Sequence, residues 1–323
     1  MGIFSNIRRH AAVAGGNFDA MFKTVNIPPL PAAVAELLAE LNRTDPDAAR
    51  LDGIISAEPE LTANVLRTVN SPLFALKHQV QNIRHAISLL GLERIRSLVL
   101  AYTMVDVLPS PRLKLFDHEA FWADSLSRSL LARALCQEIL PDHQETAFAA
   151  ALLADVALPV LLSEWCEYYE PVIARWLASQ ERLSSIEQEV FGWDHAQAGA
   201  WILQHWEFPA ELVCLVGTHN LSRDRLGELD LLDTAAPVVA LAACLPSVLK
   251  PVPQQCSRLA DKAQVELSCS AGAWTHLVEQ VQQEFHTVSR QLRLAPSRTD
   301  DLLAQLVQII PLATAGNQAG DPR

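Results

Sequence analysis

The chain has 323 residues, and its 25 Lys and Arg against 37 Asp and Glu give a formal net charge of −12. Half of the residues are hydrophobic and only 12 are glycine, which excludes disordered, collagen-like and low-complexity proteins. An acidic chain repels phosphates and anionic lipids at long range, so we expect neither a nucleic acid nor a membrane as partner.

Ala and Leu recur at three- and four-residue spacing along the chain, and no stretch alternates between apolar and polar residues. The sequence therefore predicts an all-α fold. Five short helices are expected. One covers residues 28–42, the next starts with Thr44 or Asp45 as its N-cap, and the others cover 58–69, 83–90 and 92–108. They predict an N-terminal helical lobe over residues 24–108, after an N-terminal segment of residues 1–23.

Pro109 and Pro111 mark a boundary, after which longer helices are expected. These cover residues 118–139, 144–162, 165–180, 184–191, 194–205 and 209–220. Asp194 is the expected N-cap of the helix that follows it. Together they predict a second helical lobe over residues 109–225. Residues 221–230 are expected to form a polar connector.

A C-terminal helical extension is expected over residues 226–312, followed by a flexible tail over 313–323. Its helices are predicted over 233–246, 257–266, 270–292 and 299–312. The third of these carries a heptad-like apolar stripe, formed by Leu277, Val281, Phe285, Val288 and Leu292. Such a stripe fits closure over the second lobe or self-association as a homo-oligomer, and both alternatives stay open.

The sequence favours a cytoplasmic location. The longest apolar run, Ala147–Leu162, contains Asp155 and is shorter than the roughly 20 residues of a spanning helix. The first residues contain no uninterrupted apolar region of the kind found in secretory signals. None of the six cysteines forms a C-x-x-C pair, so we expect buried free thiols in a reducing compartment.

Several segments carry a family resemblance in their order and spacing. In the first lobe they are PPLPAAVAELLAEL, LDGIISAEPELTANVLRTVNSPLF and IRHAISLLGLERIRSLVLA. In the second lobe they are FWADSLSRSLLARAL, AFAAALLADVALPVLL, GWDHAQAGAWILQHWEFP and VCLVGTHN. Over about residues 24–222 the chain resembles the HDOD family, the HD-related output domain of bacterial signalling proteins. The resemblance implies a helical bundle similar to that of HD-type phosphohydrolases.

The resemblance also implies where a metal site would lie. HD-type enzymes hold one or two divalent ions with His and Asp side chains, and the ions activate a water for phosphoester hydrolysis. Their His-Asp pair aligns with Ala154 and Asp155, and their first-helix histidine aligns with Asp124. The histidine pair of their last helix aligns with His219 and Asn220.

Only Asp124, Asp155, His195 and His219 keep groups that can bind a metal, and the family's catalytic lysine aligns with Leu158. Methyl and isobutyl groups cannot replace a ligand or a cation, so we expect a vestigial site without catalytic activity or cofactor. Each remaining group also has a purely structural interpretation, as a helix bridge or a cap. The lost histidine and lysine further predict little positive charge where an anionic substrate would bind.

We therefore expect a non-catalytic output or adaptor module of bacterial signal transduction, which binds a signalling protein or a small ligand. The alternative is a metal-dependent phosphohydrolase, a phosphodiesterase acting on nucleotides or cyclic dinucleotides, which needs the four groups to converge on an ion. A third interpretation, DNA binding by the short N-terminal helices, is opposed by the charge of −12. No phosphate-binding loop, nucleophile elbow or H-E-x-x-H motif is present in the sequence.

Overall fold

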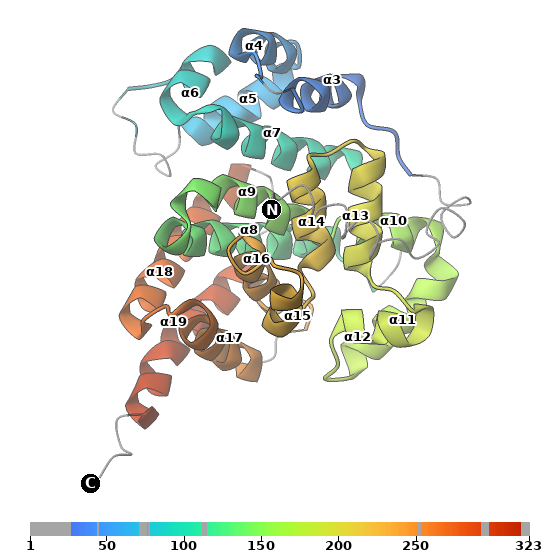
Figure 1. Ribbon diagram of the computed structural model, residues 1–323, viewed down its shortest axis with the longest axis vertical. Coiled ribbons are helices and arrows are strands. Elements are labelled where there is room, and N and C mark those ends of the chain that lie inside the picture. The colour runs from blue at the N-terminus through green and yellow to red at the C-terminus, as the bar shows by residue number, and fades with distance from the viewer. Residues whose placement is uncertain are drawn as a thin grey trace.

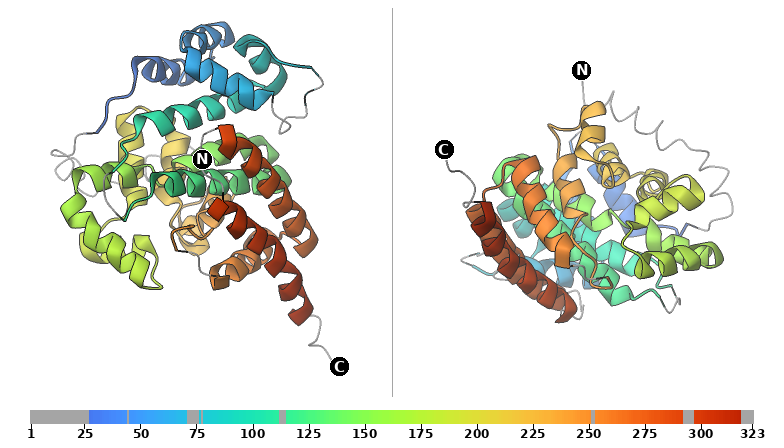
Figure 2. Two further views of the ribbon diagram at one scale, coloured as in Figure 1. Left: turned by 180° about the vertical axis from the view of Figure 1, so that it is seen from behind. Right: turned by 90° about the horizontal axis from the view of Figure 1, so that it is seen from below.

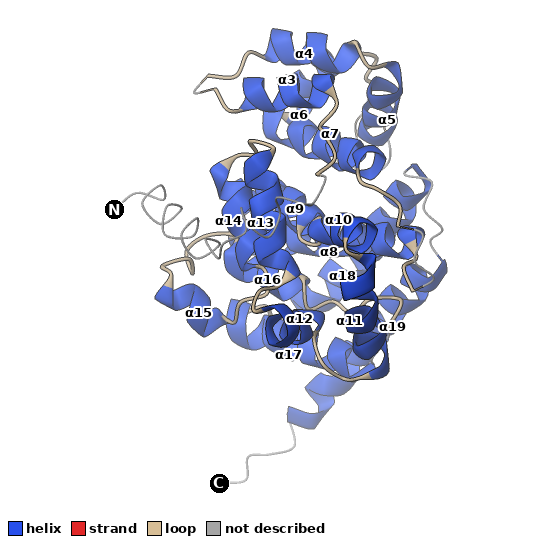
Figure 3. Cartoon of the chain, turned by 90° about the vertical axis from the view of Figure 1, so that its right-hand side faces the viewer, coloured by secondary structure: helices blue, strands red, loops and turns tan. Residues whose placement is uncertain are grey.

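The computed structural model describes residues 27–317, with the exception of 44, 71–75, 77, 112–114, 251–252 and 292–296. Helices dominate this part of the chain, and no strand occurs within it (Figure 3). The predicted all-α fold is confirmed. The expected N-terminal segment 1–23 and the last six residues of the expected tail lie outside the described residues.

Five helices form a lobe with its own apolar core, to which all five contribute side chains. They are α3 (Ala32–Leu41), α4 (Ala48–Ser56), α5 (Pro59–Val69), α6 (Ile83–Leu90) and α7 (Leu92–Val107). Helix α4 begins later than predicted, because its N-cap is Asp47 and neither Thr44 nor Asp45. The Asp47 carboxylate accepts a hydrogen bond from the backbone N–H of Ala49, which satisfies a donor of the first turn.

The central helices follow. They are α8 (His118–Ile139), the 3-10 helix η3 (Pro141–His143), α9 (Gln144–Leu153), α10 (Ala157–Glu164), α11 (Cys166–Ala178), α12 (Leu183–Phe191), α13 (His195–His205) and α14 (Ala210–Thr218). Figure 1 shows α3–α6 at one end of the molecule and two C-terminal helices, α15 (Arg223–Glu228) and α17 (Pro253–Leu267), at the other, with α8, α9 and α14 between them.

The helix predicted over 144–162 is interrupted between Leu153 and Ala157, so the single-helix prediction is wrong there. Pro159 explains the break, because proline has no N–H to donate to the carbonyl four residues earlier and its ring would clash with that carbonyl. The carbonyl in question belongs to Asp155, which instead accepts from the N–H of Leu158 in a turn. Asp155 is thereby placed outside both helices.

The C-terminal helices continue the same core. They are α15 (Arg223–Glu228), α16 (Ala236–Ala242), α17 (Pro253–Leu267), α18 (Ala271–Gln291) and α19 (Ser297–Asn317). Helix α15 lies in the predicted connector, where Ser222 caps it and accepts from the N–H of Arg225. Helix α19 continues as far as Asn317, into the residues for which a tail was predicted.

The apolar stripe of α18 is buried within the molecule. Leu277, Val281, Phe285 and Val288 are all less than 5% exposed, and Leu292 lies outside the described residues. Helix α18 packs against α8 and against α19, which lies beside it on one flank (Figure 2). Of the two alternatives for this stripe, the structure shows closure over the second lobe.

One stretch, Pro141–Glu164, is long and apolar enough to cross a membrane, although 89% of its most apolar window is buried inside the fold. A core helix of a soluble protein has this combination of hydropathy and burial. All six cysteines are free thiols, and Cys136, Cys214 and Cys256 are buried as predicted.

Candidate functional site

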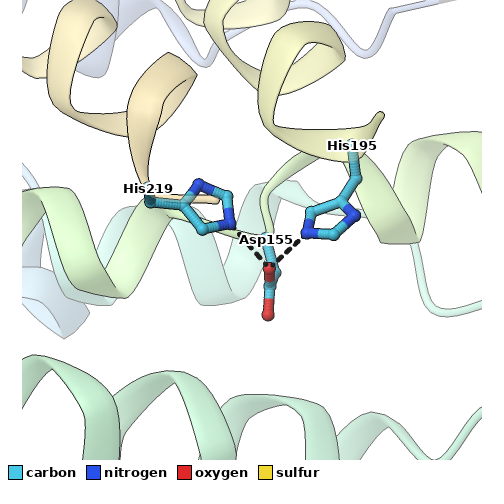
Figure 4. A group of neighbouring side chains, drawn as sticks. All are labelled: Asp155, His195 and His219. Atoms are coloured by element: carbon cyan, nitrogen blue, oxygen red, sulfur yellow. Dashed lines mark ion pairs between the residues drawn. The ribbon is translucent and has the colours of Figure 1, made fainter. Parts of the chain in front are cut away.

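Asp155, His195 and His219 converge at the centre of the second lobe (Figure 4). Oδ1 of Asp155 lies 3.3 Å from Nε2 of His195 and 3.6 Å from Nε2 of His219. The three potential ligand atoms all lie within 4.8 Å of one another. The two imidazole rings are buried and point at the carboxylate from either side.

A helix end positions each of these side chains. Asp155 lies in the turn between α9 and α10, as its interrupted helix requires. His195 is the first residue of α13, and Asp194 caps this helix as predicted, in a capping box with Gln197. His219 directly follows the last residue of α14.

Two glycines let α13 and α14 pack closely enough to bring the rings together. A Cβ atom at Gly199 would lie 3.2 Å from Cγ1 of Val216, and one at Gly217 would lie 3.0 Å from Cβ of Ala200. The centroids of the His195 and His219 rings are 5.3 Å apart. Gly199, which lies in the GWDHAQAGAWILQHWEFP segment, is therefore a packing residue of this helix pair.

The far nitrogen of each ring is held by an acceptor. Nδ1 of His195 lies 2.5 Å from Oε2 of Glu187, which also accepts from the His195 backbone N–H. Nδ1 of His219 donates to the carbonyl of Val216 at 2.7 Å. These contacts turn both Nε2 atoms toward Asp155, an arrangement that also orients histidines in metal sites.

Arg128 binds the other side of the carboxylate. Its guanidinium pairs with Oδ2 of Asp155 and also lies within 3.3–3.4 Å of the carbonyl oxygen of Leu245. Burial alone would raise the pKa of Asp155, but Arg128 and the two histidines hold it well below its usual range. Burial alone would lower the pKa of His195, but Glu187 and Asp155 raise it well above 6.5.

Asp124 does not join the cluster. Its carboxylate accepts a hydrogen bond from the backbone N–H of Val248 at 3.0 Å, in the extension. Burial raises the pKa of Asp124 to about 6, in spite of Arg128 nearby. Ala154 is buried beside the turn, and Nδ2 of Asn220 lies 3.0 Å from Nε2 of His195.

Two residues of this site were missed in the sequence. Arg128 follows Asp124 by four residues on one helix, a spacing that places both on the same face and signals it. Glu187 precedes His195 by eight residues and lies on another helix, so no local pattern marks it. The tertiary fold alone brings this fully buried carboxylate to the histidine.

Imidazole nitrogens and carboxylate oxygens are ligands that divalent ions bind. Ligands at about 2.1 Å around a tetrahedral ion lie about 3.4 Å apart, close to the 3.3 and 3.6 Å that separate Oδ1 of Asp155 from the two Nε2 atoms. An ion between Oδ1 of Asp155 and the two Nε2 atoms would nevertheless have to displace the proton that His195 shares with this carboxylate, whose Oδ2 already pairs with the guanidinium of Arg128. Asp124 is engaged elsewhere, and Ala154 offers no ligand. In this arrangement the guanidinium of Arg128 and the proton on His195 compensate the charge of Asp155, in the place of a metal ion.

The cluster lies in the wall of a cavity of about 340 Å³. Helix α8, the α9–α10 turn, α11, α12 and the extension all contribute to its lining. Five basic and three acidic residues line the cavity. The basic residues are Arg128, Arg182, Lys250, Arg258 and Lys262, and the acidic residues are Asp124, Asp155 and Glu181. The expectation of little positive charge here is therefore wrong, because three of the five cations come from the extension.

The tryptophans of the second lobe serve mainly to pack its helices. Trp122, Trp193 and Trp206 are buried, and Trp201 is half-buried and stacks on His205 with ring centroids 5.7 Å apart. None of these four lines the cavity. The packing interpretation of the sequence accords with this arrangement, and the base-stacking alternative does not.

The fold resembles three solved bacterial structures. An HDOD domain protein of unknown function from Geobacter sulfurreducens superposes with a TM-score of 0.63 at 18% identity, covering 97% of this chain and 98% of its own. A candidate phosphohydrolase from Shewanella amazonensis SB2B gives 0.60 at 23% identity, covering 88% and 97%. A candidate signal transduction protein from Marinobacter aquaeolei VT8 gives 0.56 at 17%, covering 95% and 66%.

No curated protein matches the chain in sequence. The HDOD domain family, by contrast, matches residues 27–221, which is more than half of the chain and includes Asp155, His195 and His219. The match agrees with the segments that carried the sequence resemblance and with the helical fold built around the His–Asp cluster. This chain belongs to the HDOD domain family.

Proposed function

We propose that this protein is a non-catalytic HDOD module of bacterial signal transduction, which acts in the cytoplasm by binding a small ligand or a signalling protein. The observation that carries the proposal is the guanidinium of Arg128 on Asp155. It supplies the positive charge that this carboxylate would otherwise draw from a metal ion.

A guanidinium cannot do the work of a hydrolytic metal ion. A divalent ion lowers the pKa of a bound water and offers open coordination positions to a phosphoester. Arg128 stays protonated and only donates hydrogen bonds, and its donors are already directed at Asp155 and the Leu245 carbonyl. The retained histidines then bridge α13 and α14 to the α9–α10 turn, which is a structural role.

The cavity favours a small ligand. A volume of about 340 Å³ lies within the range of about 300–1,000 Å³ that is typical of small-molecule sites. The likeness to the Marinobacter signal transduction protein supports the association with signalling. Self-association through the extension would have to use a surface other than the α18 stripe, which is buried.

The second candidate is a metal-dependent phosphohydrolase. It is favoured by the approach of Asp155, His195 and His219 to within 4.8 Å and by the likeness to the Shewanella protein. The two candidates differ in what the Asp155 carboxylate binds, a guanidinium or an ion.

The test compares wild-type protein with Arg128→Ala. Protein purified without chelator is analysed for Mn, Fe and Zn and assayed for hydrolysis of bis(p-nitrophenyl) phosphate. We expect substoichiometric metal and no turnover in the wild type. Arg128→Ala, which frees Asp155, is expected to bind Zn²⁺ at least about tenfold more tightly than the wild type in titration calorimetry.

Arg133→Ala is the matched control, because Arg133 is equally buried on α8 but pairs with Glu284 outside the cavity. This control is expected to leave Zn²⁺ affinity unchanged. Arg128→Gln gives a second variant if the alanine variant does not fold. Stoichiometric metal in the wild type, with turnover that Asp155→Asn abolishes, would establish the phosphohydrolase instead.

A further inference from the structure

Most of the basic residues that line the cavity lie outside the HD-like lobe. Lys250, Arg258 and Lys262 belong to the extension, beyond the residues 27–221 that match the family. Arg182 lies at the start of α12, where it faces Asn220 across 3.4 Å. We infer that these four cations form a binding site for the anionic group of a small organic molecule.

The acidic groups in the lining are already engaged in ion pairs or hydrogen bonds with other residues. Asp155 pairs with Arg128, and Glu181 binds Arg175 through two contacts of 2.8 and 3.0 Å. Asp124 accepts from the N–H of Val248. The cations of the extension therefore face the cavity without a buried carboxylate of their own.

The cations themselves are only weakly paired. Nζ of Lys262 lies 4.0 Å from Glu266 and 3.8 Å from Sγ of Cys244. Arg258 is exposed and has no ion pair among the described residues. Nζ of Lys250 donates to the carbonyl of Glu181. An incoming anion would therefore displace few existing interactions.

The segment from Leu245 to Lys250 holds the extension against the cavity. Arg128 binds the Leu245 carbonyl at its start, Asp124 accepts from Val248 in its middle, and Lys250 lies over the Trp176 ring, 5.3 Å from its centroid, at its end. The anion site is thus tied to the buried charges of the second lobe.

The rest of the lining indicates the body of the ligand. Leu158, Ile173 and Trp176 add apolar and aromatic surface to the lining of the same cavity. The ligand is therefore a small organic anion with an apolar or aromatic body and one phosphate or carboxylate group. This inference rests on the proposed ligand-binding function and names the ligand's chemical class.

The test measures binding to the full chain by titration calorimetry at low ionic strength. Two pairs of probes are used, AMP with adenosine and indole-3-acetate with indole-3-acetamide, so that each anion has a neutral counterpart. We expect at least one anion to bind, at least about tenfold more tightly than its neutral counterpart. Tighter binding of AMP indicates a phosphate ligand, and tighter binding of indole-3-acetate indicates a carboxylate.

The double variant Arg258→Ala/Lys262→Ala is expected to lose at least about tenfold in affinity for that anion. Arg223→Ala/Arg225→Ala on exposed α15 removes the same charge away from the cavity and is expected to change affinity by less than about twofold. Anions that bind no better than their neutral counterparts, or a cavity variant that binds like the wild type, would overturn the inference and leave the non-catalytic function standing. Release of adenosine from AMP would instead overturn the non-catalytic function while supporting the anion site.

Discussion

The charge of Arg128 is shared between two buried carboxylates of different character. Asp155 pairs with it directly and stays ionised, whereas burial raises the pKa of Asp124 to about 6. The sequence shows the i, i+4 spacing of Asp124 and Arg128, but it does not show that Arg128 pairs with Asp155. Asp155 reaches it from a turn 27 residues later.

Asp124→Asn tests this charge balance. The pKa of Asp124 is about 6 in the folded protein against 3.8 for an unperturbed aspartate, so wild-type stability falls as pH rises from about 4 to about 6. Asparagine keeps an acceptor for Val248 and removes the titration. Urea unfolding is expected to show the variant gaining about 2 kcal/mol relative to the wild type between pH 4.5 and 7.5.

The control for that experiment is Asp233→Asn, at an exposed position. Its stability difference from the wild type is expected to be small and independent of pH. A pH-independent difference for Asp124→Asn as well would show that Asp124 is ionised in the folded protein throughout this range.

Two features of single elements place the cluster. Pro159 interrupts the apolar helix that the periodicity predicted over 144–162, and the interruption places Asp155 in a turn between α9 and α10. Gly199 and Gly217 allow α13 and α14 to approach, so that His195 and His219 meet. Helix positions were predicted within a few residues because apolar spacing and caps are local. The break was missed because the apolar run continues through it.

Gly199→Val tests the close approach of α13 and α14. The branched side chain would enter a space where even a Cβ lies 3.2 Å from Val216, so overpacking is expected to cost about 1–3 kcal/mol of unfolding free energy. Gly53→Val is the matched control, because a Cβ at this helical glycine meets nothing within 4 Å. Thermal unfolding should show a lower Tm for the first variant alone, and equal Tm values would refute the packing role.

At the scale of the whole molecule, the extension shares the core of the second lobe. One cluster of buried residues runs from α8 through α14 into α16–α19, while most of α3–α7 forms a second cluster. Arg133 on α8 also pairs with Glu284 on α18. The second lobe and the extension are therefore expected to unfold together.

Phe285→Ala tests this shared core. Phe285 is fully buried on α18, so its truncation is expected to cost about 3–5 kcal/mol and to lower the unfolding transition of the second lobe as well. Tryptophan fluorescence reports that transition in a Trp274→Phe background, because Trp274 lies on α18 and the other six tryptophans lie in the second lobe. Val265→Ala, at a position 83% exposed in α17, is the control and should change little. An unchanged tryptophan transition in Phe285→Ala would show that the extension unfolds independently.

The sequence by itself determined the helical class, the approximate helix bounds and the family, because apolar periodicity, caps and ordered motifs are local properties of the chain. It also identified Asp124, Asp155, His195 and His219 as the retained polar positions. Only the tertiary structure decided what they contact. Glu187, Arg128 and the cations of α17 reach the cavity from distant segments, and the charge of a buried site depends on every group that packing brings within a few ångströms.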